Sequence, residues 1–105
     1  MLKFTLPLTL ATTLLGACGS PANLDVCHAG CDASQRCGLL SDSAASNCHR
    51  TCDDNRGSLS DKDRSDDARC QNAGSIRAEE LKCQQSACNQ ILGCLARIDR
   101  TCVTR

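Results

Sequence analysis

The pattern of hydrophobic and polar positions divides the chain into two unequal parts. An apolar stretch from Phe4 to Leu15 follows Lys3, the one basic residue of the first 17. At about a dozen residues it has the length of a secretory h-region and is too short to span a bilayer. The rest is polar with scattered small apolar positions. The pattern therefore predicts a leader over 1–17 followed by a small folded domain.

The first half of that domain predicts two helices. Asn23 or Asp25 is suited to cap a first helix that runs towards Cys37 and stops at Gly38. A second helix fades before Gly57, and Ser41 or Ser43 caps it. Apolar and cysteine positions recur along this second helix at helical spacing: Ala44, Ala45, Cys48 and Cys52.

The second half is less regular. The charged segment 60–69 predicts either a solvated loop or the polar face of a short helix that ends at Gly74. Ser75 is suited to cap a further helix, because Glu79 and Glu80 would lie in its early turns. A last amphipathic stripe recurs with helical spacing at Ile91, Leu95, Ile98 and Cys102. No segment alternates as a strand does, so we expect an all-α fold.

Cysteine usage indicates what holds this fold together. The chain has 11 cysteines, of which Cys18 follows the apolar leader and the other ten lie between Cys27 and Cys102. Ten is the number that five bridges require. We therefore expect a small disulfide-rich bundle of short helices over 27–105, with Cys18 outside the pairing.

Composition after residue 17 strengthens this expectation. Phe4 is the only aromatic residue, so the 88 residues that remain of the 105 contain none. Lys3 is one of the 12 basic residues, so 11 remain against 12 acidic residues. A near-neutral chain without aromatic rings has no stacking platform for bases and no basic footprint, which argues against nucleic acid as a partner. These 88 residues also contain few large apolar side chains. We therefore predict a domain that is stabilised mainly by disulfide bridges.

Two C-x3-C pairs define part of the expected bridging. Cysteines four apart lie along one face of a helix and do not normally bridge within it. Two antiparallel helices would then pair them in a nested pattern, Cys27 with Cys52 outside and Cys31 with Cys48 inside. The spacing leaves the pairing of six cysteines open: Cys37, Cys70, Cys83, Cys88, Cys94 and Cys102.

The segment Leu15-Gly16-Ala17-Cys18 resembles the lipobox of bacterial lipoproteins. The resemblance implies cleavage before Cys18, a lipid on its sulfur and a short tether over 18–26. Gly19, where an Asp would favour the inner membrane, implies the outer membrane and a domain facing the periplasm or the cell surface. Ordinary cleavage after Ala17 is the alternative, and it predicts a secreted, non-lipidated toxin- or inhibitor-like scaffold.

The segment 27–52 is similar in its spacing to the twin C-x3-C hairpins of plant α-hairpinins and of the small Tim chaperones of mitochondria. The resemblance covers 26 residues and implies a helical hairpin. It does not imply chaperone function, because Cys37 interrupts the pattern and the aromatic residues that could grip a client are missing.

The same segment holds an internal repeat, C-H-x-x-C-D, that contains both histidines of the chain. Thiolates with imidazoles would suit Cu or Zn, so a metal-handling periplasmic protein that uses His28 and His49 with reduced thiols is one alternative. Bridged sulfurs are no ligands, however. The simpler interpretation is that each imidazole forms an ion pair with the aspartate four residues later, Asp32 or Asp53.

Other candidate chemistry is weaker. Asp61 and Asp63 begin a pattern like a calcium loop, but Asp66 stands where such a loop needs glycine. No C-x-x-C, C-x-x-C-H or G-x-S-x-G motif occurs. We therefore expect no catalytic residues and no cofactor. The sequence favours a non-catalytic lipoprotein of the bacterial envelope with a protein partner there.

Overall fold

The computed structural model describes residues 20–105, and this part of the chain is all-helical. It contains α2 (Asn23–Arg36), α3 (Asp42–Asp54), α4 (Arg56–Arg69), α5 (Ala73–Gln84), the 3-10 helix η2 (Cys88–Gln90) and α6 (Ile91–Ala96). Within residues 20–105 there is no strand, only an isolated antiparallel bridge between Cys70 and Thr104. The prediction of a small all-α, disulfide-rich bundle is confirmed.

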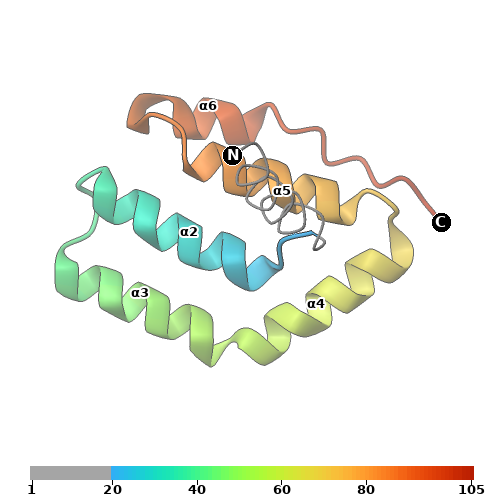
Figure 1. Ribbon diagram of the computed structural model, residues 1–105, viewed down its shortest axis with the longest axis horizontal. Coiled ribbons are helices and arrows are strands. Elements are labelled where there is room, and N and C mark those ends of the chain that lie inside the picture. Colours follow the sequence, from blue (N-terminus) through green and yellow to red (C-terminus); the bar gives the residue numbers. More distant parts are fainter. Residues whose placement is uncertain (1–19) are drawn as a thin grey trace, which may run out of the picture.

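Helix α2 is the centre of the bundle. It contacts α3, α4 and α5, and Figure 1 shows it running between the α3–α4 pair on one side and α5 with α6 on the other. The predicted start of α3 is correct, since Ser41 is its N-cap and accepts a hydrogen bond from the Ala44 backbone N–H at 3.2 Å. The α2–α3 hairpin is therefore a compact, locally encoded unit.

The start of α2 differs from the prediction. Its N-cap is Ala22, and Asn23 is already the first helical residue. The Asp25 carboxylate reaches back to accept a hydrogen bond from the Ala22 backbone N–H at 2.9 Å. Because the helix takes up residues 23–26, the tether expected over 18–26 is shorter than the sequence predicts, and Ser20 packs directly on Gly74 of α5.

The charged segment 60–69 lies in a helix of its own. Helix α4 follows α3 across the single residue Asn55 and contains Gly57. Ion pairs one helical turn apart support it, from Lys62 and Arg69 to the two oxygens of Asp66 at 2.7 and 3.1 Å. It ends at Arg69 and not at Gly74. The predicted cap at Ser75 is also wrong, because α5 begins at Ala73 with Asn72 as its N-cap.

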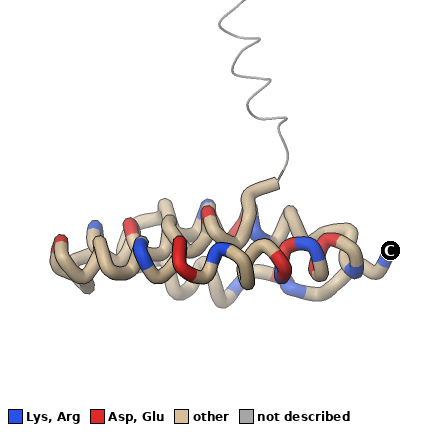
Figure 2. Tube along the Cα trace, turned by 90° about the horizontal axis from the view of Figure 1, so that it is seen from below, with Lys and Arg blue, Asp and Glu red and all other residues tan. Residues whose placement is uncertain are grey.

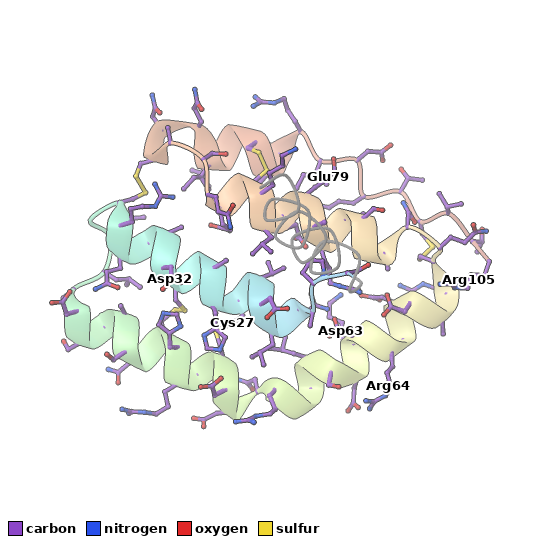
Figure 3. The ribbon with its side chains drawn as sticks, in the orientation of Figure 1. Cys27, Asp32, Asp63, Arg64, Glu79 and Arg105 are labelled. Carbon is purple, nitrogen blue, oxygen red and sulfur yellow. A yellow bond between two sulfur atoms is a disulfide. The ribbon has the colours of Figure 1, made fainter. Side chains whose placement is uncertain are left out.

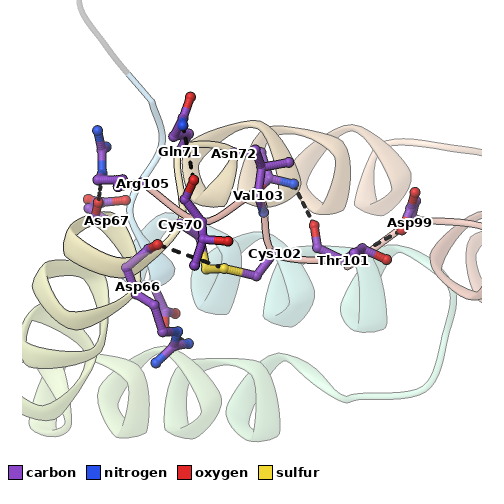
Figure 4. Close-up of a disulfide and its surroundings, with 12 residues drawn as sticks. Asp66, Asp67, Cys70, Gln71, Asn72, Asp99, Thr101, Cys102, Val103 and Arg105 are labelled. Carbon is purple, nitrogen blue, oxygen red and sulfur yellow. Dashed lines mark hydrogen bonds and ion pairs between the residues drawn. A yellow bond between two sulfur atoms is a disulfide. The ribbon is translucent and has the colours of Figure 1, made fainter.

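The amphipathic stripe that ends at Cys102 is helical only in its first part. Helix α6 stops at Ala96, and the chain returns in extended form to the α4–α5 turn. Figure 4 shows why it stays there, because the Cys70–Cys102 bridge and a hydrogen bond from the Asn72 amide to the Thr101 carbonyl at 2.7 Å hold it. Asn72 also accepts from the Val103 N–H. These long-range contacts outweigh the helical spacing.

Sulfur and alanine form the core. No Leu, Ile or Val of the described residues is buried. The buried apolar residues are four cysteines and three alanines: Cys31, Ala33, Ala45, Cys52, Cys70, Ala73 and Cys83. The five bridges are Cys27–Cys52, Cys31–Cys48, Cys37–Cys88, Cys70–Cys102 and Cys83–Cys94. The first two form the nested pattern that the sequence predicts.

Five bridges indicate an oxidising environment such as the extracellular space. No helix within residues 20–105 is long and apolar enough to cross a membrane. Figure 2 shows acidic and basic positions interspersed along the tube, without a large surface of one sign in this view. The expected leader over 1–17 and the lipidation of Cys18 lie outside the described residues.

Candidate functional site

The two histidines meet between α2 and α3. Their rings stack with centroids 4.8 Å apart, and His28 Nδ1 lies 2.5 Å from His49 Nδ1. The expected pairs within each helix are wrong, because the partners cross over: His28 Nε2 binds Asp53 at 2.9 Å and His49 Nε2 binds Asp32 at 2.8 Å. Asp32, labelled in Figure 3, lies on the side of α2 that faces α3.

Hydrogen-bond geometry defines the protons of this pair. An ionised carboxylate only accepts, so each Nε2 donates its proton to the aspartate beside it. The two Nδ1 atoms are too close to hold a proton each, so one donates and the other accepts. The quartet acts as a brace between the two helices.

The metal-handling interpretation finds no support in this geometry. The four sulfurs of the two C-H-x-x-C-D repeats form two disulfide bridges, Cys27–Cys52 and Cys31–Cys48. A sulfur in a bridge does not offer a thiolate to a metal. Within residues 20–105 no group of three or more His, Cys, Asp or Glu side chains is arranged to hold a metal ion.

The calcium pattern falls in the interior of α4, where side chains point in different directions round a helix. Asp61 forms an ion pair with Arg64, whereas Asp63 faces the start of α2 (Figure 3). The Asp63 carboxylate accepts a hydrogen bond from the Asn23 backbone N–H at 3.0 Å. It therefore fastens α2 to α4, and the two aspartates do not converge on a common point.

An apolar hollow of about 600 Å³ opens between the helices of the described residues. Its walls come from α2, α3, the end of α5, η2 and α6, and we call it the disulfide groove. Six of its fifteen lining residues are the two ends of three bridges. The complete lining is Cys27, Gly30, Cys31, Ala33, Ser34, Cys37, Leu39, Cys48, Thr51, Cys52, Gln84, Cys88, Ile91, Leu92 and Leu95.

The lining of the disulfide groove carries no charged side chain, although 23% of the residues of the chain are charged. Leu39 and Leu92 are 77% and 81% exposed, the largest exposures among the big apolar residues described. Ser34, Thr51 and Gln84 supply the only polar side chains. A concave apolar surface with a few polar groups is the usual form of a small-molecule site.

Sequence reasoning did not find this groove. Its walls depend on the Cys37–Cys88 bridge, which brings α6 to the hairpin across a sequence separation of 51 residues. The pairing of Cys37 could not be read from spacing. One signal was available, because Leu39 follows the predicted helix stop at Gly38 and Leu92 lies outside the amphipathic stripe of Ile91, Leu95 and Ile98.

A second, polar hollow of about 410 Å³ lies where α4 and α5 meet the C-terminal segment. Arg77 is buried there at 6% exposure, and its Nε donates to the Pro21 carbonyl at 2.7 Å. Its Nη2 binds Asp67 at 2.9 Å, whereas Nη1 has no hydrogen-bond partner among residues 20–105. Lys62 donates a hydrogen bond that holds the pKa of Asp66 below its usual value. These charges mostly pair with one another and fasten the start of α2 to α4.

No family profile, curated protein sequence or solved structure matches this chain.

Proposed function

We propose that this chain is a non-catalytic binding module of the bacterial envelope, exported by its leader and anchored through a lipid on Cys18. The observation that carries the proposal is the closed pairing of the ten cysteines from Cys27 to Cys102. The folded domain offers no partner to the eleventh cysteine. Cys18 is also the residue at the end of the lipobox-like segment, where a lipid would use its sulfur.

The short tether supports a location close to the membrane. Ser20 packs on Gly74, and the Pro21 carbonyl accepts a hydrogen bond from buried Arg77. Only Gly19 separates Cys18 from Ser20, so their Cα atoms lie at most about 7 Å apart when the chain is extended. A lipidated domain would therefore lie against the lipid headgroups, with the outer membrane favoured by Gly19 at the second position after cleavage.

A binding role agrees with what the domain presents. The surface is well suited to hold a ligand in the disulfide groove, which is rigidified by three bridges and has no charged group in its lining. The histidine pair, by contrast, has no free thiol beside it and each ring is already bound to an aspartate.

Replacement of the anchoring cysteine tests the proposal. In cells that express the full chain, we expect the native protein in the membrane fraction and Cys18→Ser in the soluble fraction. Cys18→Ser keeps all five bridges, so a matched control is the Ser20→Ala variant, which should stay with the membrane. If native protein and Cys18→Ser were both soluble, with an N-terminus at Cys18, the secreted, non-lipidated alternative would replace the proposal.

A further inference from the structure

The disulfide groove is lined by atoms that favour one kind of occupant. Sulfur atoms of three bridges and the aliphatic side chains of Leu39, Ile91, Leu92 and Leu95 provide most of its surface. The lining itself has no charged side chain. The Arg36 guanidinium reaches only its edge, where it donates to Cys88 Sγ at 3.7 Å and to the Gln84 carbonyl at 2.8 Å. An ion taken into such a groove would lose its hydration without compensation, so the buried part of any ligand is uncharged.

From this lining we propose that the disulfide groove binds the hydrocarbon chain of a single-chain lipid, with the head group left at the mouth. The proposal deepens the proposed binding role and rests on it for the compartment. A volume of about 600 Å³ lies within the range of about 300–1,000 Å³ that is typical of small-molecule sites. One acyl chain is a ligand of that class.

The shape of the groove favours a chain over a folded partner. Its walls come mainly from α2, α3 and α6, with one residue each from α5 and η2, so an occupant contacts side chains of several helices. A protein helix instead docks along a continuous apolar stripe, read at positions i, i+3, i+4 and i+7. The exposed Leu39 and Leu92 lie on the rim, where they extend the apolar path from the groove to the surface.

Polar groups at the groove suit a neutral contact with the head group. Ser34, Thr51 and Gln84 provide hydroxyl and amide groups without charge. They can bind the uncharged ester oxygens of an acyl chain by hydrogen bonds, whereas a phosphate or carboxylate would remain in solvent at the mouth. The chain length should therefore affect affinity more than the head group does.

Gly30 provides a steric test. It lies in the groove on α2, and a Cβ built there would have only Gln84 Nε2 within 4 Å, at 3.9 Å. A larger side chain thus enters the groove without displacing backbone. The matched control is Gly57 on α4, which has no atom within 4 Å of a built Cβ and lies outside the groove. Both replacements remove a glycine from a helix, which favours folding.

The experiment uses the full chain with Cys18→Ser, so that no lipid of its own competes, after mass spectrometry has verified five bridges. The probe is cis-parinaric acid, an unbranched 18-carbon fatty acid that fluoresces in apolar surroundings, added below its micelle concentration. We expect saturable binding of one probe per chain and displacement by palmitate or by lysophosphatidylcholine. Gly30→Leu should weaken binding at least 10-fold, and Gly57→Leu should change it less than twofold.

Leu92→Asp gives a second, independent test, because a charge at an 81% exposed rim position alters the mouth without disturbing the core. We expect a weakening of about fivefold or more. Absence of saturable binding, or equal affinity in the folded Gly30→Leu and Gly57→Leu proteins, would overturn the proposal. A dimer that Leu92→Asp dissociates, without probe binding, would show that a second copy fills the groove. None of these results depends on anchoring, which the fractionation of Cys18→Ser tests separately.

Discussion

His28 binds Asp53 on the neighbouring helix at 2.9 Å, although Asp32 lies one turn further along its own helix. The exchange is possible because the nested bridges hold α2 and α3 so close that the two rings stack. Each ring is then directed across the interface towards the opposite helix. Each copy of the C-H-x-x-C-D motif therefore supplies one histidine and one aspartate to a single four-residue brace between the helices.

The brace should be visible as a coupling energy. We expect His28→Ala and His49→Ala each to lower the free energy of unfolding by about 1 kcal/mol, and the double variant to lose less than the sum, by about 0.5–1 kcal/mol. Urea unfolding of the four proteins measures this. The control cycle uses Arg50→Ala in place of His49→Ala and should be additive. Additive losses in the histidine cycle would show that the rings act independently.

Protons at the ring nitrogens provide a second readout of the brace. Nitrogen-15 NMR of the native chain should show a coupling between the two Nδ1 atoms through a shared proton, as the 2.5 Å contact requires. Asp53→Asn should change the signal of His28 Nε2 first. Two Nδ1 signals without such a coupling would contradict the geometry.

Arg77 should matter more than any surface arginine. We expect Arg77→Met to cost about 2 kcal/mol, because it leaves the part-buried Pro21 carbonyl without its donor and the half-exposed Asp67 without its cation. Amide hydrogen exchange should increase at the start of α2 at the same time. Arg64→Met is the control, since Arg64 is 71% exposed in its ion pair and should change stability by less than about 0.5 kcal/mol.

The two nested bridges should partly replace one another. Their sequence separations are 25 and 17 residues, and either bridge alone closes most of the same loop. We expect loss of one pair, by double Cys→Ala replacement, to cost about 2 kcal/mol, and loss of both to cost about 6 kcal/mol, more than the sum of the two single losses. Urea midpoints of the three variants measure the difference. A double loss equal to that sum would show that the two bridges act independently.

Acid should weaken the domain through Asp66. Its carboxylate accepts a hydrogen bond from Lys62, and its pKa in the folded state lies below the usual value of 3.8. A lowered folded pKa stabilises the fold above about pH 4, and this stabilisation is lost as the pH falls through the folded value. Asp66→Asn should therefore flatten the decline of urea midpoints between about pH 4 and pH 2, whereas Asp54→Asn should leave that decline unchanged.

The hairpin was predictable because its information is local. Ser41 caps α3, and cysteines four apart on two antiparallel helices admit the nested pairing that the structure has. Helix α4 was harder to predict, since its apolar positions are too few for a periodic signal and ion pairs such as Lys62–Asp66 stabilise it instead. The sequence therefore left it open between loop and helix.

Long-range contacts explain the remaining differences. The extended return of the chain to Cys70 depends on Cys102 and on the Asn72 side chain, and no pattern within residues 91–102 records either partner. The disulfide groove also depends on a long-range contact, the Cys37–Cys88 bridge. The spacing of the cysteines in the sequence did not determine that these two would pair. In a chain whose core is cysteine and alanine, the disulfide connectivity determines how the helices pack. In most proteins the hydrophobic pattern determines this packing.

The most direct test of an anchored, fully bridged domain is the intact mass of the native protein from its own envelope, alkylated before and after reduction. We expect an N-terminus at Cys18 with added lipid mass, no alkylation before reduction and ten alkylated cysteines after it. Alkylation without reduction within residues 27–52, or a Cys18 that carries no lipid, would contradict this. The first result would return the C-H-x-x-C-D pair to consideration as a thiol site.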